Sequence, residues 1–165
     1  MVWLPSRVFA LLLVVAHVVE PELLAHPISF ARDGRYPALG YAAFVSLIVA
    51  ITCYGVVLLR TKHLRRFAVG PLVAAGLLVV VTLTPTMSTF HDGVAGFVLV
   101  WVTVFFAVRL LDLSPWAAGC WLTGVIVVTS GLLFVSPQWA QKVLVLAQVA
   151  MMCRDAKRVK NLTGA

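Results

Sequence analysis

Charged residues are scarce in this chain of 165 residues, at 12% of the sequence, while hydrophobic residues make up 62%. A soluble domain is about one quarter charged and about one half apolar. In water, the present composition would leave large apolar patches on the surface. The sequence therefore excludes an ordinary soluble domain and predicts one polytopic membrane domain over residues 1–165.

Cysteine is also rare, and the positions of Cys53, Cys120 and Cys153 exclude two further classes. All three lie in apolar runs, and none belongs to a Cys-x-x-Cys pair. Neither a disulfide framework nor a zinc ribbon is predicted. We expect these thiols to be small, buried hydrophobic groups.

Acidic residues are outnumbered by basic ones, six against thirteen, which gives a formal charge of +7. In a soluble protein this excess would suggest a nucleic-acid partner. Here the basic residues lie in short segments between apolar runs, a pattern that sets membrane topology. No nucleic-acid partner is therefore predicted.

Long apolar runs, by contrast, are abundant. A spanning helix needs about 20 mostly apolar residues, and these runs lack the alternation of a membrane β-barrel. The predicted fold class is therefore all-α, an integral membrane bundle of six transmembrane helices. The six segments are about 7–24, 38–59, 68–84, 94–111, 116–135 and 138–154.

The distribution of Lys and Arg predicts the orientation of the bundle. Ten of the thirteen lie at one set of segment ends, including Arg7, the run Arg60–Arg66 and Arg109. The opposite loops hold only Arg32 and Arg35. By the positive-inside rule, the N-terminus and the C-terminus are both predicted to be cytoplasmic.

The first segment has two interpretations. Arg7, an apolar core and Ala25 before His26 are also typical of a signal peptide with its cleavage site. We expect a retained helix, with a cleaved signal peptide as the alternative.

Ionisable groups gather on the predicted outer side. The polar stretch 82–93 contains His91 and Asp92, and His17 and Glu20 can share one face of the first helix. If the first and fourth helices are neighbours, these four groups could bind a metal, ligate haem or relay a proton. The ordinary alternatives are that Asp92 caps the fourth helix and that His17 and Glu20 form hydrogen bonds between helices.

Catalytic motifs are absent from the sequence. It contains no His-Glu-x-x-His, no Gly-x-Ser-x-Gly and no close pair of histidines. No cofactor is therefore predicted, with a metal or haem as the alternative, and the sequence favours a protein that is not an enzyme.

Small residues recur every four positions in the second segment, at Ala38, Ala42, Ser46 and Ala50. Such a stripe lets another helix approach closely. The approaching helix belongs to the same bundle, to another membrane chain or to a second copy of this chain.

Two further pairs of polar residues are expected to form hydrogen bonds or an ion pair within the bundle. Gln141 and Gln148 are seven residues apart, so they share a face and are expected to form hydrogen bonds with other helices. Arg109 and Asp112 have the i, i+3 spacing of an ion pair.

Several short motifs occur in order over residues 26–153. They are Ile28-Ser29-Phe30-Ala31-Arg32-Asp33-Gly34, then Leu64-Arg65-Arg66, Thr84-Pro85-Thr86 with His91, and Gln138-Trp139-Ala140-Gln141-Lys142-Val143. This order resembles the uncharacterised bacterial polytopic membrane family grouped as domain of unknown function 998, although Lys142 stands where that family tends to have Arg. The resemblance implies a six-helix fold and a bacterial inner membrane location, and it implies no established reaction.

The sequence thus favours a non-catalytic integral membrane protein, an accessory or scaffold subunit of a membrane complex. Its expected partners are the lipid bilayer and other membrane chains or a second copy. The alternative is an outer-face enzyme or a metal- or haem-binding protein that uses His17, Glu20, His91 and Asp92. A small oligomeric transporter is a third hypothesis, although no internal repeat or paired broken helices are seen.

Overall fold

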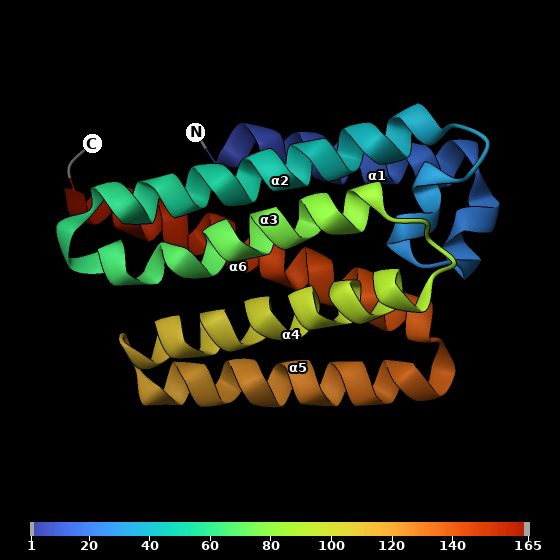
Figure 1. The fold of residues 1–165 in the computed structure, drawn as a ribbon. Coiled ribbons are helices and arrows are strands. Elements are labelled where there is room, and N and C mark those ends of the chain that lie inside the picture. The colour runs from blue at the N-terminus through green and yellow to red at the C-terminus, as the bar shows by residue number, and fades with distance from the viewer. Residues whose placement is uncertain (1, 164–165) are drawn as a thin grey trace.

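The computed structural model describes residues 2–163, apart from the side chains of residues 30, 132–135, 137 and 163. The described residues form six α-helices and three 3-10 helices, without a strand (Figure 1). The all-α fold class is thereby confirmed. The α-helices are α1 Trp3–Val19, α2 Pro37–Arg60, α3 Val69–Leu83, α4 Thr89–Leu111, α5 Pro115–Val135 and α6 Pro137–Thr163.

Four helix boundaries differ from the sequence prediction by four residues or more, and the first helix begins at Trp3 rather than at residue 7. The first helix ends at Val19 rather than at residue 24, because Pro21 has no N–H to continue the ladder and begins the 3-10 helix η1, Pro21–Ala25. The fourth helix begins at Thr89 rather than at 94, because the Ser88 hydroxyl accepts a hydrogen bond from the His91 N–H.

The sixth helix continues to Thr163, well beyond the predicted end at residue 154. Hydropathy indicates where an apolar segment stops, whereas Arg, Lys and Ala remain good helix formers in water. The basic C-terminal segment therefore extends the helix without extending the apolar run.

The helices run up and down, and each α-helix packs against the next one in the chain. The last helix, α6, also contacts α1, α2 and α4, so it lies behind the other helices in the middle of the bundle (Figure 1). Both termini lie at one end, together with the α2–α3 and α4–α5 connections. We call this the basic end, because it carries Arg60–Arg66, Arg109, Arg154 and Arg158. The other end, with η1 and η2 (Ile28–Arg32), is the opposite end.

Close approaches to α2 are made at glycines. A Cβ atom on Gly40 would collide with the backbone of Ala31 and Arg32 in η2, and one on Gly55 would lie 2.8 Å from the Leu72 side chain of α3. Glycine at position 40 therefore lets the backbone of η2 contact α2, and glycine at position 55 makes room for a side chain of α3.

The stripe of small residues on α2 is only partly covered. Ala50 is buried and Ser46 is half-buried, whereas Ala38 and Ala42 are exposed. Within the described chain, the part of the stripe near the opposite end therefore has no helix packed over it.

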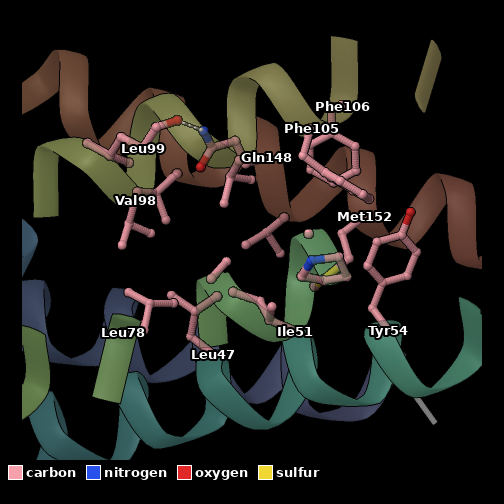
Figure 2. A pocket seen from close by; sticks show the side chains of 16 residues that line it. Leu47, Ile51, Tyr54, Leu78, Val98, Leu99, Phe105, Phe106, Gln148 and Met152 are labelled. Atoms are coloured by element: carbon pink, nitrogen blue, oxygen red, sulfur yellow. Dashed lines mark hydrogen bonds between the residues drawn. The ribbon is translucent and has the colours of Figure 1, made fainter. Parts of the chain in front are cut away.

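The buried core includes side chains of α1, α2, α3, α4 and α6, for example Phe9 of α1, and its centre lies between α2, α3, α4 and α6. It encloses a cavity of about 60 Å³ whose lining is almost entirely apolar (Figure 2). Gln148 is the amide in this lining, and its Nε2 donates to the Leu99 carbonyl and to Thr103 Oγ1, each at 3.0 Å. These bonds cross from α6 to α4 and confirm the expected contact between helices.

The three cysteines are all free. Cys153 is buried and Cys53 is half-buried, as expected for small hydrophobic groups. Cys120 is exposed, contrary to the expectation. It lies on α5, whose α-helical neighbours are α4 and α6, so much of α5 remains uncovered.

Two of the described helices, α2 and α4, are long and apolar enough to cross a membrane by length and composition. The helices α1 and α3 are apolar but shorter, with 17 and 15 residues. Large hydrophobic side chains are exposed along these helices, for example Leu4 at 72% and Leu83 at 78%. These features give some support to a membrane location.

Candidate functional site

Buried polar side chains form one cluster at each end of the bundle. At the opposite end, Arg32 of η2 is only 3% exposed. Its Nη1 donates to the carbonyls of Val81, at 2.8 Å, and Thr82, and its Nη2 donates to the Thr84 carbonyl at 3.0 Å. The last carbonyls of a helix lack partners within the helix, so Arg32 caps the end of α3.

The environment of Arg32 acts on its charge in two ways. Burial lowers the pKa of Arg32 from its ordinary value, and the nearby charge of Asp33 opposes this change. The Arg32 guanidinium also lies 5.6 Å from the centre of the Phe44 ring, within the range of a cation–π contact. These contacts fit a structural cation at the α1–α2 connection.

Lys142 of α6 caps a second helix at this end. It is 4% exposed, and its Nζ donates to the carbonyls of Leu23 at 2.7 Å and Leu24 at 2.9 Å, in η1. The neighbouring Gln141 accepts a hydrogen bond from the Ile28 N–H at 3.0 Å, so its expected bond outside α6 is confirmed. Together these two side chains fasten the α1–α2 connection to α6.

His17 and Glu20 point to different partners. His17 Nδ1 lies 2.7 Å from the Leu13 carbonyl of its own helix, and its Nε2 is buried without a hydrogen-bond partner among the described residues. Glu20 Oε2 accepts from the Arg35 N–H at 2.8 Å, across the α1–α2 connection. The two side chains do not bond each other. Glu20 stabilises the α1–α2 connection instead of forming the expected hydrogen bond with another helix.

His91 and Asp92 line a pocket of about 250 Å³ with Ser29, Gln138 and Gln141. His91 is 1% exposed. Its Nδ1 lies 3.1 Å from Thr84 Oγ1, and its Nε2 is buried without a hydrogen-bond partner in the described part of the chain.

The interpretation of Asp92 as the cap of α4 is wrong, because Ser88 occupies the N-cap position. Asp92 is an exposed carboxylate in the first turn, where the positive end of the helix dipole favours a negative charge.

The structure does not bring the four predicted outer-face residues together. The helix α1 packs against α2 and α6 and has no extensive contact with α4. Among the described residues, no hydrogen bond or ion pair joins His17 or Glu20 to His91 or Asp92. Across the same residues, no group of three or more His, Cys, Asp and Glu side chains is placed to hold a metal ion.

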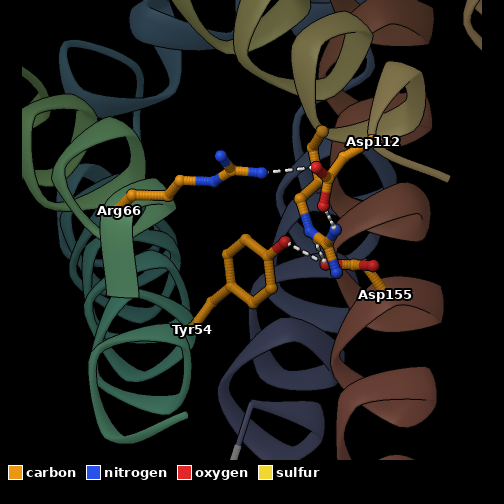
Figure 3. Close-up of polar contacts among 5 residues, drawn as sticks. Tyr54, Arg66, Asp112 and Asp155 are labelled. Atoms are coloured by element: carbon orange, nitrogen blue, oxygen red, sulfur yellow. Dashed lines mark hydrogen bonds and ion pairs between the residues drawn. The ribbon is translucent and has the colours of Figure 1, made fainter. Parts of the chain in front are cut away.

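At the basic end, a polar network connects four elements (Figure 3). The Tyr54 hydroxyl donates to Asp155 Oδ2 at 2.5 Å, and Arg109 Nε donates to the same oxygen at 3.2 Å. Arg109 Nη1 lies 3.5 Å from Asp112 Oδ2, which confirms the expected ion pair, and Arg66 Nη2 lies 2.5 Å from Asp112 Oδ1. The network thus joins α2, α4 and α6 with η3, Lys62–Phe67.

Sequence reasoning missed most of this network. It assigned Arg109 to membrane topology and paired it only with Asp112, and it gave Asp155 no role, yet Arg109 is 1% exposed and Asp155 is 8% exposed. Asp155 is a carboxylate among basic residues directly after an apolar run, and this was the available signal. An ionisable group beside an apolar segment is usually paired.

Comparison with known proteins identifies no relative. No family model, no curated protein and no solved structure matches the chain. The family resemblance suggested by short motifs therefore stays a prediction.

Proposed function

We propose that the chain is a six-span membrane protein of a bacterial inner membrane, with a non-catalytic, accessory role in a membrane complex. The observation that carries the proposal is the use of its buried cations. Arg32 and Lys142 are committed to backbone carbonyls that end helices. Cations held this way stabilise a bundle and are not free to act on a substrate.

Six spans are supported by the alternation of the helices and by the charge at their ends. Successive helices run in opposite directions, so the chain crosses the bundle with each α-helix (Figure 1). The excess of Lys and Arg lies at the end that carries both termini. A helix of 15 residues such as α3 is about 22 Å long, shorter than a hydrocarbon core of about 30 Å. Local thinning of the bilayer would accommodate it.

An accessory role is supported by the uncovered helix α5. Its α-helical neighbours are α4 and α6, and large apolar side chains are exposed along it, including Leu122, Ile126 and Val127. Ala38 and Ala42 leave a second uncovered strip on α2. These surfaces would face lipid, another membrane chain or a second copy of this chain.

The six-span topology is tested by cysteine labelling in cells, in a chain whose native cysteines are replaced. Met87→Cys lies on the α3–α4 connection, where the side chain is 85% exposed, and Lys157→Cys lies at the basic end. A membrane-impermeant maleimide should label position 87 in intact cells and position 157 only after permeabilisation. Labelling of both in intact cells would contradict the proposed topology.

The accessory role is tested by crosslinking in native membranes from a photoreactive side chain at Ile126. We expect a defined adduct with another membrane chain or with a second copy. A monodisperse lone monomer after purification, with no adduct recovered in the membrane, would contradict the accessory role.

A second candidate function is a ligand or metal site in the pocket beside His91. The specific observation is the buried Nε2 of His91, which has no hydrogen-bond partner among the residues that the structure describes, because a buried polar atom without a partner is costly. Metal analysis and an absorption spectrum of the purified protein would test this function. The matched variants are His91→Ala, which should abolish any signal, and His17→Ala, which should preserve it because His17 does not line the pocket.

A further inference from the structure

The basic end contains a pocket of about 520 Å³ between α4, α5 and α6. On each of these helices the lining residues recur after three or four positions, as Met151, Arg154 and Arg158 do on α6, so each helix contributes one continuous face. Ligand pockets commonly measure about 300–1,000 Å³. The volume is therefore suited to a small ligand or to a lipid headgroup.

Arg109 lines this pocket, and two of its donor groups form no hydrogen bond with any residue that the structure describes. Its Nε donates to Asp155, and one face of its guanidinium lies 5.2 Å from the centre of the Phe67 ring. Among the described residues, its Nη1 and Nη2 have no hydrogen-bond partner, although Nη1 is within ion-pair distance of Asp112. Arg109 is 1% exposed, so these N–H groups are buried and call for an acceptor.

The charge of the lining favours an anion. Arg109, Arg154 and Arg158 contribute three positive charges, and Asp155 contributes one negative charge. The Asp155 carboxylate already accepts hydrogen bonds from Tyr54 and Arg109. The pocket therefore keeps a cationic excess, and the planar guanidinium group matches phosphate with paired hydrogen bonds.

The rest of the lining is apolar and aromatic. It includes Phe106, Leu110, Leu113, Trp121 and Met151, and Trp116 is 80% exposed at its rim. An arginine cluster next to an apolar wall fits a molecule with a charged head and a hydrocarbon tail. Exposed tryptophan is typical of the headgroup level of a bilayer.

We infer that this pocket binds a phosphate group, with Arg109 supplying the paired donors and Arg154 and Arg158 flanking the anion. The phosphate belongs either to an anionic membrane lipid or to a soluble phosphate compound. Basic pockets between spanning helices on the cytoplasmic side are suited to lipid phosphates. The lipid source rests on the proposed membrane topology, whereas the phosphate site itself rests only on the geometry of the basic end.

The experiment uses the full chain purified in a neutral detergent. Binding of phosphatidylglycerol and of phosphatidylcholine is measured by native mass spectrometry, with inorganic phosphate as the competitor. We expect phosphatidylglycerol to bind at least about tenfold more tightly than phosphatidylcholine. Both lipids have a phosphate that can accept charge-assisted hydrogen bonds, but only phosphatidylcholine carries a choline cation that the arginines would repel. Equal affinity for the two lipids together with no effect of inorganic phosphate would overturn the inference.

Two double variants separate the pocket from the general charge of the basic end. Arg154→Gln with Arg158→Gln removes two charges from the pocket, and Arg60→Gln with Arg65→Gln removes two exposed charges outside its lining. The first pair should weaken phosphatidylglycerol binding about tenfold or more, and the second should change it less than about twofold. Equal losses in both pairs, or a loss in neither, would overturn the inference.

The variant Arg109→Lys tests the paired donors directly. Lysine keeps the positive charge beside Asp155 but lacks the planar fork, so binding should fall. The unfolding temperature of the variant is measured alongside to establish that it is folded. Unchanged phosphatidylglycerol binding in a folded Arg109→Lys protein would overturn the role of Arg109. Competition by inorganic phosphate would assign a soluble phosphate as the source, and its absence with lipid selectivity intact would assign the lipid; both results support a phosphate site.

Discussion

Arg109 on α4 and Asp155 on α6 form a buried ion pair, with Nε of the arginine 3.2 Å from Oδ2 of the carboxylate. The two helices are separated in the chain by all of α5, and this pair connects them at the basic end. Tyr54 brings α2 into the same contact through its hydrogen bond to Asp155. One carboxylate thus fixes the relative position of three helices.

The first prediction concerns this carboxylate. Asp155→Asn leaves the Arg109 charge buried with only the more distant Asp112 to compensate it, and we expect a loss of about 3 kcal/mol in unfolding free energy. Tyr54→Phe removes one hydrogen bond to a charged acceptor and keeps the ion pair, so its cost should be about 1.5 kcal/mol. Reversible unfolding in mixed detergent measures both, and a wild-type stability for Asp155→Asn would contradict the structural role of the pair.

The second prediction concerns the capping of α3 by Arg32. Arg32→Gln removes a charged group that donates to three carbonyls at the end of α3, so the last turn of α3 should open more often and its amides should exchange hydrogen faster. The amide of Thr84, which donates to the Val80 carbonyl, is the most direct reporter. Hydrogen exchange measured by mass spectrometry checks this result.

Arg35→Gln is the matched control for that measurement. Arg35 lies in the same connection and is exposed, with its guanidinium over the Tyr36 ring. Its replacement removes the same charge but leaves the α3 carbonyls capped. Equal acceleration of exchange in both variants would show that charge, rather than capping, protects α3.

The third prediction concerns the polar contact between α4 and α6 in the core. A double-mutant cycle of Gln148→Leu and Thr103→Val should give a coupling energy of about 0.6 to 1.7 kcal/mol, the range for side-chain hydrogen bonds inside membrane bundles. The Leu99 carbonyl is also bonded by Gln148, so Gln148→Leu alone should cost more than Thr103→Val alone. Strictly additive effects would mean that the two side chains do not interact.

The fourth prediction compares two glycines. Gly40→Ala places a methyl group against the backbone of Ala31 and Arg32, which cannot move as a side chain can, so we expect a loss of at least about 2 kcal/mol. Gly76→Ala meets nothing within 4 Å and should be neutral or stabilising by up to about 1 kcal/mol. Thermal unfolding of the two variants tests the contrast, and equal behaviour would contradict the close approach of η2 to α2.

Much of the secondary structure could be predicted from the sequence, because apolar runs and their polar interruptions are local properties. All six predicted helical segments correspond to α-helices. The errors fall at the ends, where a single group decides the boundary: Pro21 beyond α1, and the Ser88 hydroxyl at the start of α4. Both residues are visible in the sequence, but the predicted boundaries followed hydropathy, which does not take a helix-breaking proline or a capping hydroxyl into account.

The candidate sites could be predicted only in part. The pairing of Arg109 with Asp112 follows from helical spacing, and it was correct. The convergence of His17 and Glu20 with His91 required α1 to lie beside α4, and the neighbours of α1 are α2 and α6 instead. The periodicity of apolar residues does not show which helices are neighbours. The sequence therefore could not test whether the four outer-face residues lie together.

By itself, the sequence determined an all-helical chain with alternating apolar segments and with its basic residues gathered at one set of ends. Only the tertiary structure decided that α6 packs against α1, α2 and α4 as well as α5, bringing Lys142 to η1 and Asp155 to Arg109. The physical reason is distance along the chain: these contacts join residues 46 to 119 positions apart, and they form only after the helices have packed.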